Sequence, residues 1–234
     1  MTTATSPAYE LKGEQIAAAE QIAAFLADPA KKTFLLEGGA GTGKTYTAQA
    51  LLDSVKGRVL YTAPTNKATK VLRESVTTDD YKPECRTIYS LLGLRMEANG
   101  EIKELREPED PIDISQFRAV IVDEGSMVNA QLFKYIEKAS ATFGVRFLFL
   151  GDAAQLPPVG ETASPIWAIK NTARLTKVMR HDNQILELAT RIRDQVDRFS
   201  PTIKLVAAND GQQGIWKMSG PDFLRAIRED AEGG

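Results

Sequence analysis

The sequence predicts an α/β protein with a mostly parallel, doubly wound sheet that has helices on both faces. Short apolar runs, of the length of buried strands, alternate along the chain with segments whose apolar residues recur at helical spacing. Several of these runs end directly in glycine, proline or acidic residues. Ligands of such sheets bind where the strands end, so these residues are the first candidates for a site.

Bulk composition sets limits on partners and location. The net charge is −2 and the pI is about 5.6, so no global basic field attracts nucleic acid, and any such contact must be local. The single cysteine, Cys85, rules out an internal disulfide framework and is compatible with a reducing compartment. No run approaches about 18 apolar residues and no secretory signal is present, so we expect no membrane contact and a cytoplasmic location.

The first expected elements lead into a glycine-rich loop. A helix is predicted over residues 14–26 and ends at Asp28-Pro29. Its apolar side is expected to comprise Ile16, Ala19, Ile22, Ala23 and Leu26. A buried strand over residues 34–36 follows, then the loop, then a helix through about Leu52.

The loop from Gly38 to Thr45 matches the G-x-x-x-x-G-K-[ST] phosphate-binding pattern. Glycines let the backbone turn its N–H groups toward a polyphosphate, and the following helix N-terminus favours the same anion. Lys44 is expected along the β- and γ-phosphates, and the Thr45 hydroxyl is expected to bind magnesium. The loop positions expected to hold the polyphosphate are Gly39, Ala40, Gly41, Thr42, Gly43, Lys44 and Thr45. The alternative is a chance glycine-rich turn before a helix.

The remaining pattern gives further elements in chain order. The apolar side of the helix predicted at 66–76 is expected to comprise Ala68, Val71 and Leu72. Asn99-Gly100 is a strong hairpin signal. The expected elements are a strand at 58–63, a helix at 66–76, a helical turn at 87–92, a hairpin at 95–105, an acidic surface excursion at 104–113, a strand at 119–122, a helix at 129–139, a strand at 145–150, and helices at 183–195 and 222–227.

Two of the predicted strands end in acidic residues. The strand at 119–122 runs into Asp123-Glu124, which would bring Asp123 near a magnesium bound at Thr45 and place Glu124 to polarise an attacking water. The alternative is a solvated acidic strand end. The strand at 145–150 is followed by Gln155 on a proline-stiffened loop, and its amide can hydrogen-bond a γ-phosphate or the attacking water. The alternative is a proline turn after a core strand.

The order of these segments resembles the helicase motifs of superfamily 1. The sequence of residues 155–159 is most similar to the RecD-like and Dda-like 1B branch. The resemblance covers about Gln15 to Arg193. The segments that carry it are 38–45, 63–68, 87–89, 122–127, 151–159 and 175–180. It implies a P-loop NTPase with a RecA-like fold that binds ATP and Mg²⁺ and hydrolyses ATP, and a chain that contacts single-stranded DNA.

The resemblance also assigns roles to individual residues. It implies that Gln15 recognises adenine and that Arg180 reaches the γ-phosphate from across the domain junction. Thr87 belongs to a second DNA-contacting motif, in which Tyr89 stands where the family usually has histidine; an aromatic ring can stack on a base. The segment implied to grip the DNA backbone comprises Pro64, Thr65, Asn66 and Lys67.

The chain is expected to contain one whole motor domain and part of another. Residues 1–30 are expected to form an N-terminal helical segment, and 31–178 a RecA-like ATPase domain with a short hairpin insertion at about 94–113. Residues 179–234 would begin a second, incomplete RecA-like domain, since the family's later motifs do not occur. We therefore expect a fragment of a helicase, weakly active alone, whose second domain is supplied in cis or trans. Branch analogy suggests 5′-to-3′ translocation for the intact protein.

Two other interpretations stay open at this point. The chain could be a nucleotide-switched nucleic-acid-binding module that does not translocate, or an RNA helicase of the same superfamily. A role of the short hairpin in separating strands is implied by the resemblance alone. We assign no chemistry to His181, Cys85, Trp167 and Trp216, and expect both tryptophans to be packing residues.

Overall fold

The computed structural model describes residues 10–52, 58–76, 82–99 and 102–179, and the backbone of two short strands further along the chain. The chain forms two compact units, Met1–Met179 and Arg180–Gly234. In the second unit, β9 (Ala208–Asn209) pairs with β10 (Gly214–Ile215) in antiparallel fashion. The helices predicted at 183–195 and 222–227 lie outside the described residues.

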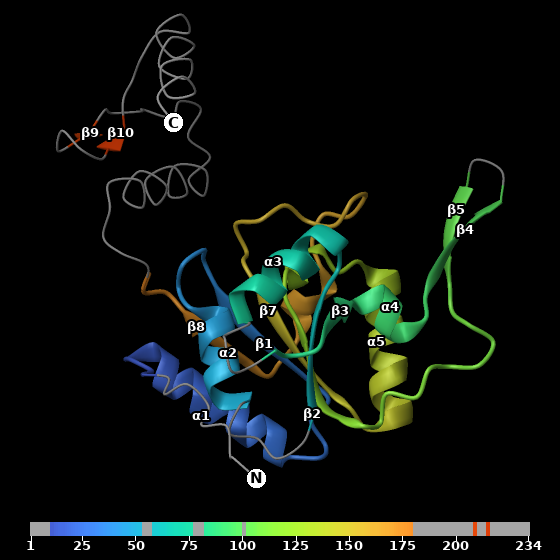
Figure 1. The fold of residues 1–234 in the computed structure, drawn as a ribbon, viewed down its shortest axis with the longest axis horizontal. Coiled ribbons are helices and arrows are strands. Elements are labelled where there is room, and N and C mark those ends of the chain that lie inside the picture. Colours follow the sequence, from blue (N-terminus) through green and yellow to red (C-terminus); the bar gives the residue numbers. More distant parts are fainter. Residues whose placement is uncertain are drawn as a thin grey trace, which may run out of the picture. The chain divides into compact units, whose positions relative to one another are not determined.

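A 6-stranded sheet with the order β3-β2-β6-β7-β1-β8 forms the centre of the first unit (Figure 1). Every pairing in it is parallel, so the predicted doubly wound α/β fold is confirmed. The strands are β1 (Thr33–Gly38), β2 (Arg58–Ala63), β3 (Cys85–Thr87), β6 (Phe117–Val122), β7 (Arg146–Gly151) and β8 (Thr172–Leu175). The pattern did not predict the edge strands β3 and β8, because each is short and neither is a continuous apolar run.

Helices cover both faces of this sheet. One face carries α1 (Glu14–Ala27), α2 (Lys44–Leu52) and α3 (Asn66–Val76). The other carries α4 (Ile88–Leu92), α5 (Ala130–Phe143) and the 3₁₀ helices η1 (Gly125–Met127) and η2 (Pro165–Ala168). Within the described part of the chain, no helix has the length and apolar content needed to cross a bilayer.

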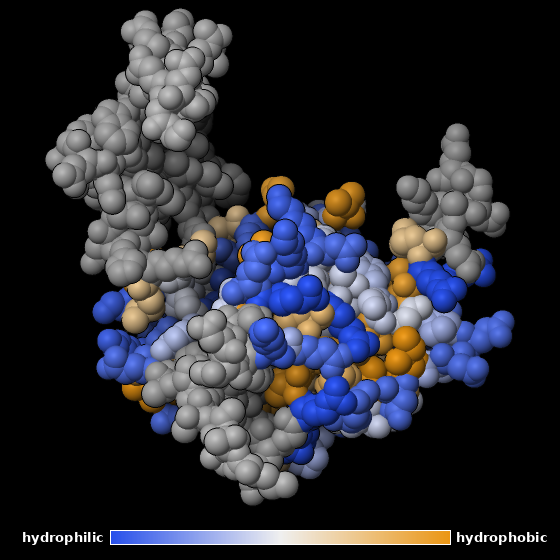
Figure 2. Space-filling view, viewed as in Figure 1, coloured by the Kyte–Doolittle hydropathy of each residue, from blue (hydrophilic) through white to orange (hydrophobic). Residues whose placement is uncertain are grey.

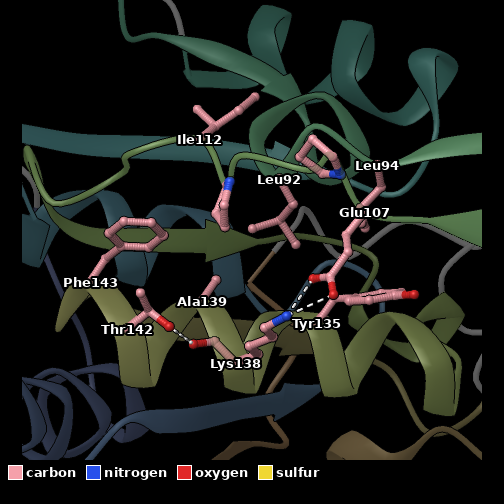
Figure 3. A pocket seen from close by; sticks show the side chains of 11 residues that line it. Leu92, Leu94, Glu107, Ile112, Tyr135, Lys138, Ala139, Thr142 and Phe143 are labelled. Carbon is pink, nitrogen blue, oxygen red and sulfur yellow. Dashed lines mark hydrogen bonds and ion pairs between the residues drawn. The ribbon is translucent and has the colours of Figure 1, made fainter.

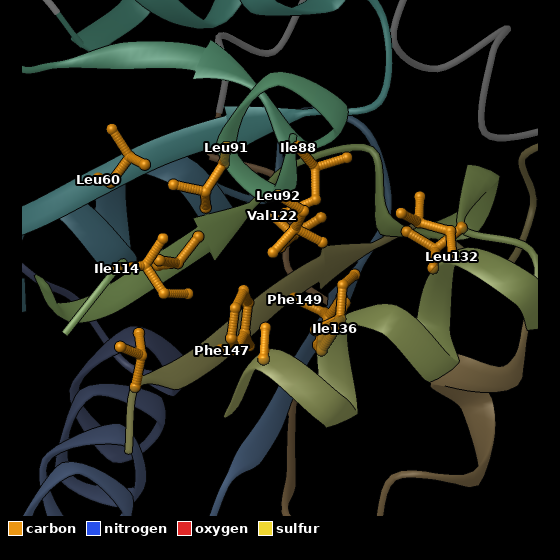
Figure 4. Close-up of a cluster of buried hydrophobic side chains, with 14 of the residues drawn as sticks. Leu60, Ile88, Leu91, Leu92, Ile114, Val122, Leu132, Ile136, Phe147 and Phe149 are labelled. Carbon is orange, nitrogen blue, oxygen red and sulfur yellow. The ribbon is translucent and has the colours of Figure 1, made fainter. Parts of the chain in front are cut away.

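Each central strand contributes to two hydrophobic cores, because successive side chains of a strand point to opposite faces. Phe147 and Phe149 pack on the α5 side, in the cluster drawn in Figure 4. Leu148 and Leu150, the residues that alternate with them, pack on the α1 side. The continuous apolar runs in the sequence therefore reflect strands that are covered on both faces. On the face shown in Figure 2, the described surface is mostly hydrophilic, and hydrophobic residues appear in small groups.

The helix α5 shows clear signals at both ends. The Asn129 side chain accepts a hydrogen bond from the Leu132 amide at 2.8 Å and caps the N-terminus. Gly144 ends the helix in the left-handed conformation with φ 70°, which costs a glycine little. The helix thus ends at Phe143, beyond the predicted end at residue 139.

The predicted apolar sides of two helices are confirmed only in part, since the residues buried as predicted are Ala19, Ile22 and Leu26 of α1 and Leu72 of α3. In α1, Ile16 is 48% exposed and Ala23 is exposed, whereas Phe25 is buried. In α3, Val71 is 58% exposed. The residues buried in place of those predicted are Gln15, Ala18 and Phe25 in α1 and Thr69 and Val76 in α3. The predictions for Ile16, Ala23 and Val71 were therefore wrong. The buried side of α1 includes the large Phe25 and also Gln15, which contacts the loop after β1.

The predicted hairpin is present as β4 (Arg95–Asn99) and β5 (Ile102–Arg106), which pair in antiparallel fashion with Asn99 opposite Ile102. The start of the acidic segment, predicted as a surface excursion from residue 104, instead completes β5 as far as Arg106. Pairing with β4 accounts for this difference.

The rotation of α1 gives a matched test of the core. Ile22→Ala removes a side chain with 0% exposure and is expected to lower the free energy of unfolding of the first unit by about 2–4 kcal/mol. Ile16→Ala, the same change on the same helix, is expected to cost less than about 0.5 kcal/mol. Urea unfolding followed by circular dichroism measures both, and equal costs would contradict the described rotation.

Candidate active site

The candidate site lies at the carboxyl edge of the sheet. The strands β6, β7, β1 and β8 are consecutive neighbours and run parallel, so their ends meet at one edge (Figure 1). The predicted loop follows β1, Asp123-Glu124 follows β6, and Gln155 comes shortly after β7. The residues that the sequence singled out on separate segments therefore share one edge.

The loop between β1 and α2 is tightly closed. Thr42 donates its hydroxyl to the Gly39 carbonyl at 2.9 Å, and Gly41 and Gly43 adopt φ of 77° and 86°. A Cβ on Gly38 would lie 2.6 Å from Thr42 Oγ1 and 2.9 Å from the Leu175 carbonyl oxygen. Glycine is thus required at position 38 because the loop and β8 both press against it.

The Lys44 side chain lies inside this loop. Its Nζ donates hydrogen bonds to the carbonyls of Gly38 at 2.8 Å and Gly39 at 3.1 Å. Its positive charge also acts on Asp123, where it lowers the carboxyl pKa. The charge of the loop lysine therefore reaches the acid that follows β6.

Asp123 extends the β2–β6 pairing by one residue, since its amide donates to the Thr62 carbonyl at 2.8 Å. Its Oδ1 accepts the Glu124 amide at 2.9 Å. Burial raises the pKa of the Asp123 carboxyl; this hydrogen bond and the charge of Lys44 oppose the rise, and the charge of Glu124 adds to it. A carboxylate in this setting gains from a nearby cation.

Glu124 has a strained backbone. Its φ of 52° and ψ of 39° are left-handed, and among the described residues it is the one non-glycine with positive φ. This conformation costs a residue with a Cβ about 1–2 kcal/mol. It turns the chain sharply from β6 into η1, and such strain is concentrated at functional sites.

A hydrogen bond links the segments after β6 and β7. The Ser126 hydroxyl donates to Gln155 Oε1 at 2.6 Å, and Ser126 is only 2% exposed. Asp152 supports the loop, since its Oδ1 accepts the Ala154 amide at 3.0 Å. Beyond Gln155, the side chains of Leu156 and Val159 are exposed. Sequence reasoning missed Ser126, because nothing distinguishes it from other serines after a strand.

Gln15 lies against the loop although it belongs to α1. It is 3% exposed, its Nε2 donates to the Thr42 carbonyl at 3.4 Å, and its Oε1 accepts the Lys12 amide at 3.2 Å. A Cβ on Gly43 would lie 2.4 Å from Gln15 Nε2. A pocket opens beside this contact. Its lining residues are Lys12, Gly13, Glu14, Gln15, Thr42, Leu175, Lys177 and Met179.

Glu14 joins α1 to the segment after β8. Its carboxylate accepts the amide and the hydroxyl of Thr176, both at 2.6 Å, and the amide of Lys177 at 3.1 Å. The Met179 amide donates to the Gly41 carbonyl at 2.9 Å. Sequence reasoning missed this clasp, the contacts of Glu14 with Thr176 and Lys177, since the partners stand 162 and 163 residues apart.

The residues predicted to contact nucleic acid lie at the other end of the strand order. Thr65 follows β2 and Thr87 ends β3, and these two strands are neighbours. Both hydroxyls accept an amide of the next helix, from Ala68 and Ser90, at 3.1 Å. Asn66 and Lys67 are exposed, and Pro64 is buried. Tyr89 is half-buried and packs against the core, and burial raises the pKa of its hydroxyl.

Two residues to which the sequence assigned no chemistry lie in or against the hydrophobic core. Trp167 packs against the core, as predicted, and Cys85 is buried, which raises the pKa of its thiol. Arg180, His181 and Trp216 lie outside the described residues, so the geometry around them plays no part in the site.

A family model described as an AAA domain matches residues 10–211. This chain belongs to that family. Within it, the parallel sheet and the ordered motifs make the first unit a RecA-like motor domain of the superfamily 1B helicase type, whose named relatives are ATP-dependent DNA helicases.

Named relatives share this domain. The motor domain is similar to the ATP-dependent DNA helicase dda of Enterobacteria phage T4, with 30% identity over 170 residues, 68% of this chain and 37% of that protein. It is also similar to the ATP-dependent RecD2 DNA helicase of Deinococcus radiodurans, with 32% identity over 187 residues, 76% of this chain and 23% of that protein. The chain thus spans well under half the length of these relatives.

A solved structure supports the same fold. The crystal structure of Bacteroides sp Pif1 in complex with ADP-AlF4 has a TM-score of 0.56 to this chain at 19% identity, and covers 82% of this chain and 47% of that one. At this identity the likeness concerns the arrangement of strands and helices.

The strain at Glu124 reverses an ordinary stability order. Alanine is usually more stable than glycine by about 0.5–1 kcal/mol. At position 124 we expect Glu124→Gly to be more stable than Glu124→Ala by about 1 kcal/mol, because φ is 52° there. Thermal unfolding of the two variants measures the difference. The ordinary order at this position would show that the left-handed conformation is not held in solution.

The clasp predicts a specific titration. Hydrogen bonds from Thr176 and then Lys177 lower the pKa of the Glu14 carboxyl from its ordinary value of 4.5. The clasp is therefore complete above about that pH and is lost as the pH falls through the lowered pKa. In Thr176→Val the midpoint is expected to move back up, because the hydroxyl donor is the largest cause of the shift. Carboxyl NMR titration measures it; Thr172→Val on β8 is the control, and an unmoved midpoint in Thr176→Val would contradict the clasp.

Proposed function

We propose that this chain carries the ATP-binding first motor domain of a superfamily 1B DNA helicase. The observation that carries the proposal is the convergence at one sheet edge of a closed phosphate loop, a part-buried acid on which the charge of Lys44 acts, a strained glutamate, and a glutamine held by Ser126. Each of these groups has a task in ATP hydrolysis, and together they leave few other reactions.

ATP would bind with its polyphosphate in the loop from Gly38 to Thr45. Lys44 now donates to two loop carbonyls, and the oxygens of the β- and γ-phosphates would replace them as charged acceptors. The adenine would enter the pocket beside Gln15, whose amide offers both a donor and an acceptor. Gln15 suits this task because contacts with Lys12 and Thr42 already fix its orientation.

The residues present fit a magnesium ion. Mg²⁺ prefers oxygen ligands and is commonly held by one or two carboxylates together with substrate phosphates. Thr45 offers a hydroxyl at the start of α2, and Asp123 offers a carboxylate whose burial makes a cation favourable. When bound, the ion would neutralise charge on the phosphates. Thr45 is the last residue of the phosphate loop, and Asp123 follows β6, which β7 separates from β1.

Glu124 and Gln155 would act on the attacking water and the γ-phosphate. Glu124 is turned out of β6 by its left-handed backbone and is proposed to polarise the water as a general base. Because the Ser126 hydroxyl occupies Gln155 Oε1, the amide nitrogen of Gln155 remains to donate to the γ-phosphate or the water. Ser126 thereby acts as a positioning residue. Arg180 would add a positive charge at the γ-phosphate, a role that rests on the motif alone.

Nucleic acid is proposed to bind across the ends of β2 and β3. The exposed Asn66 and Lys67 offer amide and ammonium donors that suit phosphates without reading sequence. The hydroxyls of Thr65 and Thr87 are used as acceptors by helix amides and can still donate to a phosphate. The relatives named as DNA helicases favour single-stranded DNA as the strand. Pro64 is buried at the start of this turn, and the exposed part of the Tyr89 ring could stack on a base.

Movement along a strand requires two motor domains that close on ATP and open after hydrolysis. We propose that Arg180–Gly234 begins the second domain and that the intact protein moves 5′-to-3′. The sheet of the first unit accounts for one domain, so the chain alone is expected to hydrolyse ATP slowly. The relatives are longer, which supports this division of labour.

Two substitutions separate binding from hydrolysis. Lys44→Ala removes the charged donor and is expected to weaken Mg-ATP binding roughly 10- to 100-fold. Glu124→Gln is expected to leave binding nearly unchanged and to slow single-turnover hydrolysis by about 10²–10⁴. Calorimetric titration and a quenched-flow assay measure the two quantities, and Lys170→Ala is the exposed control. Unchanged hydrolysis in Glu124→Gln would rule out its role as the base.

Strand binding with and without a nonhydrolysable ATP analogue tests the class of protein. A translocating motor domain is expected to change its affinity with nucleotide and, once joined by a second domain, to show DNA-stimulated hydrolysis. Nucleotide-dependent binding without stimulated hydrolysis in that setting would favour the switched binding module. Competition between matched DNA and RNA oligonucleotides decides the nature of the strand, and robust stimulated hydrolysis by this chain alone would contradict the need for a second domain.

A further inference from the structure

The hairpin β4–β5 projects from the side of the first unit that carries α4 and α5 (Figure 1). It pairs with no strand of the central sheet. A lone two-stranded hairpin is marginally stable in water, so its position on the domain depends on contacts at its base. Those contacts come from α5, a helix to which no role in ATP binding or hydrolysis is assigned.

One polar face of α5 holds the base of the hairpin. Gln131 Nε2 and the Tyr135 hydroxyl both donate to the carbonyl of Leu105 in β5, at 3.2 and 3.1 Å. Lys138 Nζ donates to both carboxylate oxygens of Glu107, at 2.7 and 2.8 Å (Figure 3). The three helix residues lie at i, i+4 and i+7 and therefore share one side of the helix. We name Gln131, Tyr135 and Lys138 the hairpin seat.

Apolar contacts also hold the base of the hairpin β4–β5. Leu105 is buried in the core cluster on the α5 side. The chain after β5 folds back on the end of α4, where a Cβ on Gly93 would lie 2.9 Å from Ile112 Cδ1 and 3.1 Å from Pro108 Cγ. Figure 3 shows Leu94, Glu107 and Ile112 gathered over α5 around a pocket. The two strands of the hairpin are thus anchored at neighbouring points of the domain.

The N-terminal end of α5, where Gln131 of the seat also lies, is tied to the candidate active site. The chain passes from Glu124 through η1 to the helix cap at Asn129. The Ala130 amide donates to the Glu161 carboxylate at 2.9 and 3.2 Å. The Ser164 hydroxyl donates to the Val128 carbonyl at 2.6 Å and to that of Gly125 at 3.3 Å. Gln131 and Tyr135 follow Ala130 within the first two turns of α5, so the hairpin base and the connection to η1 are held by the same part of one helix.

We propose that the hairpin seat fixes β4–β5 to the ATPase domain through α5, so that the hairpin, η1 and the strand β6 move as one rigid body. Gln131, Tyr135 and Lys138 are positioning residues in this account. This account rests on the proposed function in one respect: the hairpin would be held at a fixed place relative to the ATP site of the first motor domain.

The members of the seat are not equal. The Lys138–Glu107 pair is largely exposed, and solvent screens such pairs strongly. The two bonds to the Leu105 carbonyl are part-buried and converge on one acceptor, and losing both would leave a carbonyl beside the core without those donors. Gln131 and Tyr135 are therefore the residues to change.

Hydrogen exchange on this chain tests the seat without reference to catalysis. In the double variant Gln131→Ala, Tyr135→Phe, amides of residues 95–99 and 102–106 are expected to exchange about 3- to 10-fold faster, because local opening becomes easier. Amides of β1 and β6 are expected to keep their rates. Lys134→Ala, an exposed change on the same helix, is expected to alter neither set. Wild-type rates in the hairpin of the double variant would overturn the proposal.

A milder variant and a second measurement separate local opening of the hairpin from general loosening of the domain. Tyr135→Phe alone keeps the ring packing and is expected to speed hairpin exchange by about 2-fold with an unchanged melting temperature. A uniform rise across β1, β6 and the hairpin in both variants would also overturn the proposal, since it would mean general loosening. ADP affinity is expected to stay the same in every variant. Failure of the unsubstituted chain to bind ADP would count against the proposed function, while the exchange rates would still decide the seat.

Discussion

The pairing of β1 with both β7 and β8 is the constraint on which the rest of the site depends. It places the phosphate loop in the middle of one edge, between the loop that carries Gln155 and the segment that begins at Thr176. The approach is so close that Gly38 has no room for a Cβ between Thr42 and Leu175. Any shift of β8 would therefore press on the loop directly, and the geometry of phosphate binding is inseparable from the order of the strands.

Electrostatics and strain are combined at the end of β6. Asp123 is part-buried, which disfavours its charge, and Lys44 offsets part of this cost. Glu124 stores backbone strain one residue later. Two unfavourable features in succession persist because β2 on one side and η1 on the other fix the chain, and an ion and a nucleotide would relieve the first of them. Stability has been given up here where chemistry needs preorganised groups.

The sequence predicted the central strands well and placed the residues proposed to act on ATP after the ends of these strands, and the reason is local. Residues 58–63 and 66–76 match β2 and α3 because Pro64-Thr65 separates an apolar run from a helical one. Lys44, Asp123 and Gln155 stand in patterns that need only a few neighbours. The exact rotation of α1 and α3 about their axes could not be predicted, since Ile16 and Val71 are as apolar as the residues that are buried. The Glu14 clasp and the left-handed Glu124 depend on partners and turns far beyond any local window.

The clasp also bears on how force passes through the molecule. The chain that leaves the first unit is bonded to α1 by Glu14 and to the phosphate loop by the Met179 amide on Gly41. Tension on that outgoing chain would be felt first at the loop, before it reached any strand of the core. Conversely, a loop stiffened by a bound polyphosphate would resist the pull. The bond between Met179 and Gly41 therefore gives a pull at the exit of the domain a direct path to the loop after β1.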